Sequence, residues 1–127
     1  MQWLIDYCKR HHIHAFCKSE LDPNQKSYSY RYPRVIFLND HWQVANEKPF
    51  ILAHEIGHAM CTKEDLVTSK DTYSNMSKNE CKANIFAVKL LRKYYEESDI
   101  EFDSIYDFAD AFGIPKKYQY LLNEVCY

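Results

Sequence analysis

The sequence predicts a single α+β domain in which a small antiparallel sheet packs on helices. Strand-like runs are confined to the first third of the chain, and helical patterns follow from Glu47 onward, a segregation typical of this class. The 127 residues, 46% of them apolar, amount to one domain. Only two glycines and four prolines argue against a loop-built or disordered chain. We therefore expect residues 1–127 to form one domain.

The first third is expected to supply one helix and the sheet. Apolar residues at helical spacing predict an amphipathic opening helix: Trp3, Leu4, Tyr7, Cys8 and His11. Residues 13–16 resemble a short strand, and residues 28–32 alternate with period two, as a half-buried strand does. After Pro33, residues 34–38 form a further strand-like run.

The remainder of the chain is expected to be helical. Pro49 suits a first helical turn, and three apolar residues form one stripe of the helix that follows: Leu52, Ile56 and Ala59. Residues 62–79 are polar and irregular, which predicts a long loop. A second long helix then begins near Glu80, and its apolar face comprises Ala83, Phe86, Ala87, Leu90, Leu91 and Tyr94.

Two shorter helices are predicted at the end of the chain. Ser104 and Asp107 have capping-box spacing, so a helix should begin there. Gly113 is a typical residue just past a helix end, and Pro115 is a typical first-turn residue of the last helix.

Charge and cysteine content exclude several classes of function. The formal charge is −2, and residues 101–127 hold five acids against two bases, so we expect no direct binding of nucleic acid. No apolar run is long enough to span a membrane, and the first residues do not resemble a signal peptide. The five cysteines are odd in number and form no CxxC pair, which favours reduced thiols in a cytoplasmic protein.

The motif that carries chemistry is His54-Glu55-Ile56-Gly57-His58, an HExxH sequence. Residues four apart share one helix face, so both imidazoles can reach one Zn²⁺. Glu55 projects from the same helix and can act as the general base that activates a water. Gly57 costs about 1 kcal/mol in a helix interior, which a close backbone approach beside the site would explain. The motif therefore predicts one zinc ion per chain.

A catalytic zinc also needs a third protein ligand. Cys61 is excluded, because it lies about 10 Å along the helix axis from His54. Glu80 is the best candidate, and Asn84, one turn further on, could hold the second N–H of a ligating imidazole. The spacing alone leaves alternatives open. Glu80 could instead form a capping box with Ser77, and the rival ligands are Glu64, Asp65 and Asp71.

Two segments of the sequence resemble the ImmA/IrrE family of small zinc metallopeptidases. Residues 50–59 match the pattern F-x-x-A-H-E-x-G-H-A, and residues 80–91 match E-x-x-A-N-x-F-A-x-x-L-L. Residues 35–39 also resemble the strand ending in Asn that precedes the active-site helix in this family. The likeness covers roughly residues 1–95. The chain departs from the family at residues 92–95, where Met-Pro is frequent, and it is short for the family.

The resemblance implies a zincin-like fold with a gluzincin-like site. His54, His58 and Glu80 would be the zinc ligands, and Glu55 would be the general base. The family typically cleaves helix-turn-helix repressors of phages and mobile elements, which derepresses their genes. We therefore expect a zinc endopeptidase with such a repressor as its protein substrate. The alternative is a non-proteolytic, zinc-containing protein of the antirepressor type that regulates a partner by contact.

The reaction also needs a donor for the oxyanion. The sequence offers Tyr73, His41 or a tyrosine of the 28–32 strand, such as Tyr30, and does not choose among them. The tyrosines at positions 28, 30 and 32 are expected in the core or on the sheet surface, where an extended substrate could add along an edge strand.

Overall fold

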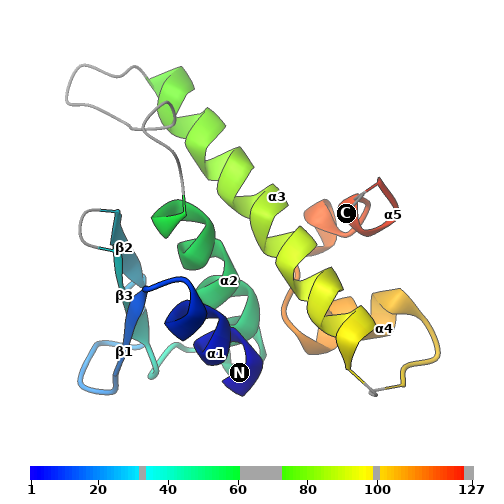
Figure 1. Cartoon of the computed structure of the whole chain (residues 1–127), viewed down its shortest axis with the longest axis horizontal. Helices are drawn as coiled ribbons and strands as arrows, with labels where there is room; N and C mark the ends of the chain where they lie inside the picture. Colours follow the sequence, from blue (N-terminus) through cyan, green and yellow to red (C-terminus); the bar gives the residue numbers. More distant parts are fainter. Residues whose placement is uncertain (32–33, 61–72, 99–100, 125–127) are drawn as a thin grey trace.

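The computed structural model has the predicted α+β class. It describes residues 1–31, 34–60, 73–98 and 101–124. A three-stranded sheet lies on one side of helix α2 (Lys48–Ala59), and the long helix α3 (Tyr73–Glu97) lies on the other side (Figure 1). Helix α1 (Gln2–Arg10) contacts α2 and the first strand. The helix that bears HExxH is therefore the middle layer of the molecule.

The sheet is mixed, which corrects the prediction of an antiparallel sheet. Its strands β1 (His14–Lys18), β2 (Tyr28–Arg31) and β3 (Arg34–Asn39) have the order β1-β3-β2. β2 pairs with β3 in antiparallel register, whereas β1 is parallel to β3. β2 lies within the connection from β1 to β3, and this connection is long enough for the crossover that a parallel pair needs. The alternation of apolar and polar residues within a strand does not reveal whether the strand runs parallel or antiparallel to its neighbour.

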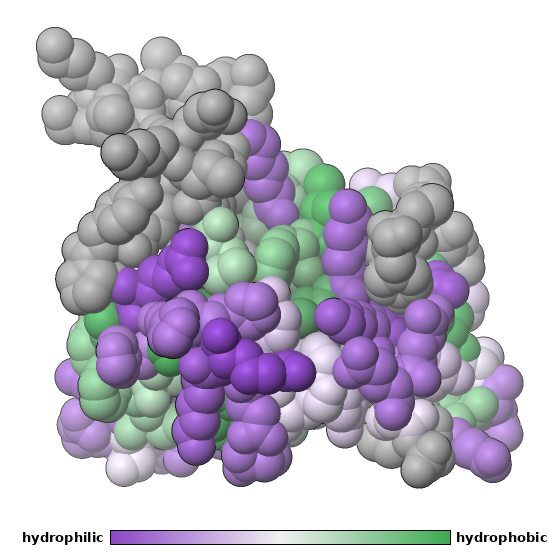
Figure 2. All heavy atoms as spheres, in the orientation of Figure 1, coloured by the Kyte–Doolittle hydropathy of each residue, from purple (hydrophilic) through white to green (hydrophobic). Residues whose placement is uncertain are grey.

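Alternation in β2 and β3 separates an inner face of the sheet from an outer one. Ile36 and Leu38 of β3 are buried on the face that packs on α2. Phe37 points the other way and stacks on rings of both neighbouring strands, among them Phe16 and Tyr28. Charged and polar residues cover much of the face drawn in Figure 2, and hydrophobic residues show along α3 and on the outer side of the sheet. The predicted tyrosine stripe thus belongs to the sheet surface where it is described.

Gly57 lies where α2 and α3 come closest. A Cβ atom built on Gly57 would lie 3.1 Å from both the Cα and the carbonyl oxygen of Ala83, and 3.2 Å from the Cβ of Phe86. Two of these three atoms belong to the backbone of α3, so a local side-chain rotation cannot relieve the contact. The predicted close backbone approach is confirmed.

We expect Gly57→Ala to lower the free energy of unfolding by about 1 kcal/mol. Overpacking costs about 1–3 kcal/mol, and the better helix propensity of alanine returns about 1 kcal/mol. Urea denaturation followed by circular dichroism measures the difference. Lys89→Ala, at an exposed position of α3, is the control for propensity without contact. A Gly57→Ala protein more stable than the wild type would contradict the packing argument.

Helix α3 begins earlier than the sequence pattern indicates. It starts at Tyr73, so residues 73–79 of the predicted 62–79 loop are helical, and Glu80 lies two turns inside the helix. The capping-box interpretation of Ser77 and Glu80 is therefore wrong, because a capping box forms only at a helix start. The first turns of α3 extend past the end of α2 in Figure 1, which explains why they carry no apolar periodicity. No described helix combines the length and apolar character needed to cross a membrane.

The C-terminal helices pack against α3. Helix α4 (Ile105–Ala111) begins at the predicted cap, where the Ser104 side chain accepts a hydrogen bond from the Asp107 amide. The helix ends at Ala111, and Gly113, two residues further on, forms the predicted stop with a φ of 76°. The amides of Gly113 and Ile114 donate hydrogen bonds back to the carbonyls of Asp110 and Ala109. The predicted last helix is instead divided into a 3-10 turn (Lys116–Tyr118) and the short helix α5 (Leu121–Glu124), with Pro115 preceding the turn. Fully buried Phe108 joins α4 to Tyr94 and Tyr95 of α3.

Candidate metal centre

Two helices bring the three predicted ligands together. His54 and His58 lie one turn apart on α2, and Glu80 comes from the facing helix α3. Helices α2 and α3 contact each other closely where Gly57 meets Ala83. Leu52 and Ile56 are buried on the side of α2 opposite the two histidines. The apolar stripe of α2 therefore turns the two imidazoles toward α3 rather than toward the sheet.

The ligand atoms of the three residues converge on one point. His54 Nε2 lies 3.0 Å from Glu80 Oε2, His58 Nε2 lies 3.0 Å from Glu80 Oε1, and the two Nε2 atoms are 3.1 Å apart. Tetrahedral zinc with bonds of 2.0–2.1 Å would hold its ligand atoms about 3.3 Å apart. Two nitrogens and a carboxylate at this spacing fit a single small divalent cation. The group His54, His58 and Glu80 can therefore bind a metal ion.

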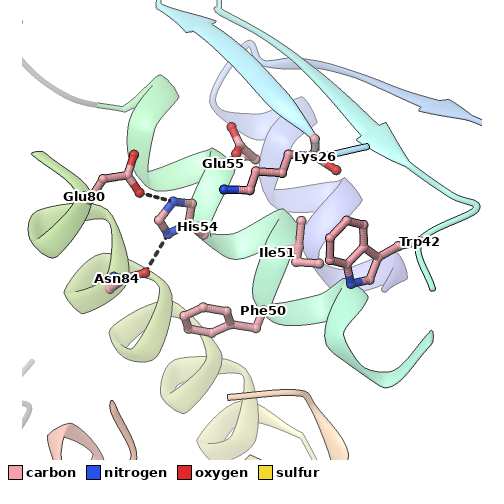
Figure 3. A pocket seen from close by; sticks show the side chains of 9 residues that line it. Lys26, Trp42, Phe50, Ile51, His54, Glu55, Glu80 and Asn84 are labelled. Carbon is pink, nitrogen blue, oxygen red and sulfur yellow. Dashed lines mark hydrogen bonds and ion pairs between the residues drawn. The ribbon is translucent and has the colours of Figure 1, made fainter. Parts of the chain in front are cut away.

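Asn84 orients the first of the imidazoles. Its Oδ1 lies 2.7 Å from His54 Nδ1, and Figure 3 shows His54 held between Asn84 on one side and Glu80 on the other. Because an amide oxygen only accepts hydrogen bonds, Nδ1 carries the proton and Nε2 keeps its lone pair for a cation. Asn84 is 8% exposed, so this contact is shielded from water. The structure thus places Asn84 where the spacing suggested.

Glu55 lies beside the ligand group in a buried position. Glu55 is only 8% exposed, and burial raises the pKa of its carboxyl to about 7. The Ser29 side chain forms a hydrogen bond with this carboxyl that opposes the shift, and the nearby charge of Glu80 adds to it. A carboxyl with a pKa near neutrality can both accept and return a proton, as a general base requires.

Ser29 is a residue that the sequence analysis missed. It lies in β2 opposite Ile36 of β3, on the inner face of the sheet. The sequence does indicate on which face Ser29 lies, because the alternation that places Tyr28 and Tyr30 on one face of the strand places Ser29 on the other. Recognising it as a partner of Glu55 requires the packing of the sheet on α2.

A pocket of about 390 Å³ opens beside the ligand group. Its lining combines the site residues with apolar side chains and one cation: Lys26, Ser27, Trp42, Phe50, Ile51, His54, Glu55, Glu80 and Asn84. In Figure 3 the pocket extends from His54 and Glu80 to Trp42, with Lys26 reaching over it. Lys26, Ser27 and Trp42 were not predicted as site residues, because they lie outside both motifs.

The two predicted oxyanion donors whose side chains are described, Tyr30 and His41, do not line this pocket. Tyr30 is 57% exposed on the outer face of the sheet, with its ring against Tyr28 and Phe37. His41 is exposed, with Nδ1 3.1 Å from the Leu21 carbonyl, and it is not among the lining residues. Tyr73 begins α3, and its side chain lies outside the described part of the chain. The rival ligands Glu64, Asp65 and Asp71, as well as Cys61, also lie outside it.

Two imidazoles one helical turn apart, a glutamate from the next helix and a buried glutamate beside them are the arrangement of a metal-dependent peptidase. The model of the family described as the IrrE N-terminal-like domain, peptidase family M78, matches residues 8–127. The chain belongs to this family, and the resemblance predicted from its motifs is confirmed. No curated protein and no solved structure gives a significant match.

Proposed function

We propose that this protein is a cytoplasmic, gluzincin-like zinc endopeptidase that cleaves a helix-turn-helix repressor of a phage or mobile element and so derepresses its genes. The observation that carries the proposal is the convergence of His54, His58 and Glu80 next to a buried Glu55, in a chain of a peptidase family. The described cysteines, Cys8, Cys17 and Cys81, are free thiols, which suits a reducing compartment.

The chemistry divides among the residues of the site. His54, His58 and Glu80 would hold the zinc ion, which when bound supplies a Lewis acid for the peptide carbonyl. Asn84 keeps His54 in the tautomer that offers Nε2. Glu55 takes the proton of the attacking water and returns it to the leaving amine, and burial holds it close to the reacting atoms.

The edge of strand β2 is the expected binding site for the substrate backbone. This strand is at the edge of the sheet, and its Ser29 contacts the carboxyl of Glu55. An extended peptide can add to a free strand edge through main-chain hydrogen bonds. Such a peptide would run past Glu55 with one of its peptide bonds near the ligand group. Tyr28 and Tyr30 lie on the outer face of the sheet, which is turned away from this binding edge.

The proposal is tested by mixing the zinc-loaded protein with the repressor encoded nearest to its gene. We expect a single new cut in the repressor and loss of its DNA binding, both absent with Glu55→Gln. Mass spectrometry locates the cut, and a gel-shift assay follows DNA binding. If the wild type alters DNA binding while the repressor stays intact, the protein acts by contact instead. If it neither cuts nor affects the repressor, this substrate is wrong.

A further inference from the structure

We propose that Lys26 selects substrates that carry a carboxylate close to the scissile bond, by pairing with that carboxylate in the pocket beside the metal centre. The inference rests on the proposed peptidase function and names a feature of its substrate. Three observations carry it: the charge of Lys26 has no carboxylate partner among the described residues, its backbone is held in place, and its pocket leads to the ligand group.

Lys26 brings an uncompensated charge to the pocket. Within the described parts of the chain, no carboxylate lies within ion-pair distance of its ammonium group. The two glutamates of the pocket are engaged elsewhere, Glu80 with both imidazoles and Glu55 with Ser29. Figure 3 shows the Lys26 side chain directed along the pocket toward His54. An anionic group entering the pocket would therefore meet a cation that is free to pair with it.

The segment that carries Lys26 is anchored by fully buried Asn39 at the end of β3. The side-chain amide of Asn39 donates to the carbonyls of Asp22 (2.9 Å) and Gln25 (2.7 Å), and its backbone amide donates to Ser27 Oγ (2.8 Å). These bonds hold the residues on both sides of Lys26. A lysine on a fixed backbone loses less freedom on pairing, which makes it a selective contact.

The apolar residues that line the pocket suit the methylene groups of an acidic side chain. Phe50, Ile51 and Trp42 supply apolar surface, and Trp42 is held by a 2.9 Å hydrogen bond from Nε1 to Glu47. A glutamate side chain would lay its methylene groups on these walls and direct its carboxylate to Lys26. A C-terminal carboxylate of a peptide has the same charge, so it is the second source of this chemistry.

Cleavage profiling tests the proposal. A synthetic library of peptides with both ends blocked is digested by the zinc-loaded protein, and mass spectrometry identifies the cuts. Lys26 is exposed, so its pairing with a carboxylate is weakened by water. We expect Glu or Asp to be enriched at one fixed position beside the cut, by roughly two- to fivefold over Gln or Asn. Lys26→Glu should reverse this preference toward Lys and Arg, and Lys26→Met should abolish it. Lys18→Glu is the matched control, because Lys18 lies over Phe37 on the outer sheet face, and it should keep the wild-type profile.

A second library with free C-termini separates the two sources of the carboxylate. Cuts confined to the end of free peptides would assign Lys26 to the C-terminal carboxylate, whereas internal cuts beside Glu or Asp would assign it to a side chain. A profile without any acidic preference, or one that Lys26→Glu leaves unchanged, overturns the proposal.

A binding measurement decides the inference even if no peptide is cut. In a Glu55→Gln protein with Trp3→Phe, Trp42 is the one remaining tryptophan and reports on the pocket by its fluorescence. A blocked hexapeptide with a central Glu should bind roughly two- to fivefold more tightly than its Gln counterpart, and Lys26→Met should remove the difference. Absence of cleavage by the wild type would count against the proposed function. Equal binding of the two hexapeptides would count against the role of Lys26.

Discussion

Replacing Glu80 by Gln is expected to lower zinc affinity by at least about a hundredfold. The substitution keeps the shape of the side chain but replaces an anionic ligand with a neutral amide. Loss of a partner outside the ligand shell already costs about 10–100-fold in metal affinity, and loss of a direct ligand should exceed that. Competition with a zinc chelator of known affinity measures the change.

Three comparisons make the Glu80 result specific. Asn84→Ala should give a smaller loss, about 10–100-fold, because Asn84 only orients His54. Glu97→Gln, an exposed glutamate near the end of the same helix, should change nothing. Helix content should stay constant throughout, since Glu80 lies inside α3 and does not cap it. Zinc affinity unchanged by Glu80→Gln would move the third ligand to another residue, with Glu64, Asp65 and Asp71 the first to examine.

Replacing Glu55 by Gln is expected to lower kcat by about 10²–10⁴-fold while zinc binding is retained. A glutamine has no carboxylate to take the proton from water, and general-base catalysis typically contributes a factor of this size. The substitution should not weaken the fold, because a neutral amide is easier to bury than an ionised carboxylate. Initial rates on a cleavable peptide, with zinc content measured on the same samples, provide the test.

The control for the Glu55 experiment is Glu96→Gln. Glu96 is an exposed glutamate that pairs with Arg92 on α3, far along the helix from the site, and its loss should leave the rate unchanged. A Glu55→Gln protein that keeps zinc and turns over near the wild-type rate would remove Glu55 from the mechanism. A protein that loses zinc together with activity would show that Glu55 supports metal binding instead.

Much of the site was readable from spacing alone. His54 and His58 are four residues apart on a helix with a buried apolar stripe, so they must share one helix face regardless of the rest of the fold. The same periodicity placed Asn84 one turn from Glu80 on one face of α3. The helix-propensity cost of Gly57 predicted a close neighbour, and that neighbour is the backbone of Ala83. Each of these inferences rests on interactions within a turn or two of helix.

The errors and omissions share a different cause. Strand direction and order depend on the path of the connections, so the parallel pairing of β1 and β3 was not predictable from alternation. The first turns of α3 extend past α2 and carry no apolar pattern, so its start was placed too late. Tyr30 was one of three candidate oxyanion donors among which the sequence did not choose, and the pleat turns it to the outer face of the sheet.

Taken by itself, the sequence determined what local periodicity can encode, namely the HExxH helix and the helix that carries Glu80. The resemblance of these two motifs to a known family supplied the family. Only the tertiary structure decided which distant side chains complete the pocket. Lys26 is brought there by a segment that Asn39 ties down, and Ser29 reaches Glu55 because the sheet packs on α2. The physical reason is that side-chain direction follows from local backbone geometry, whereas proximity between distant segments follows from how the core is buried.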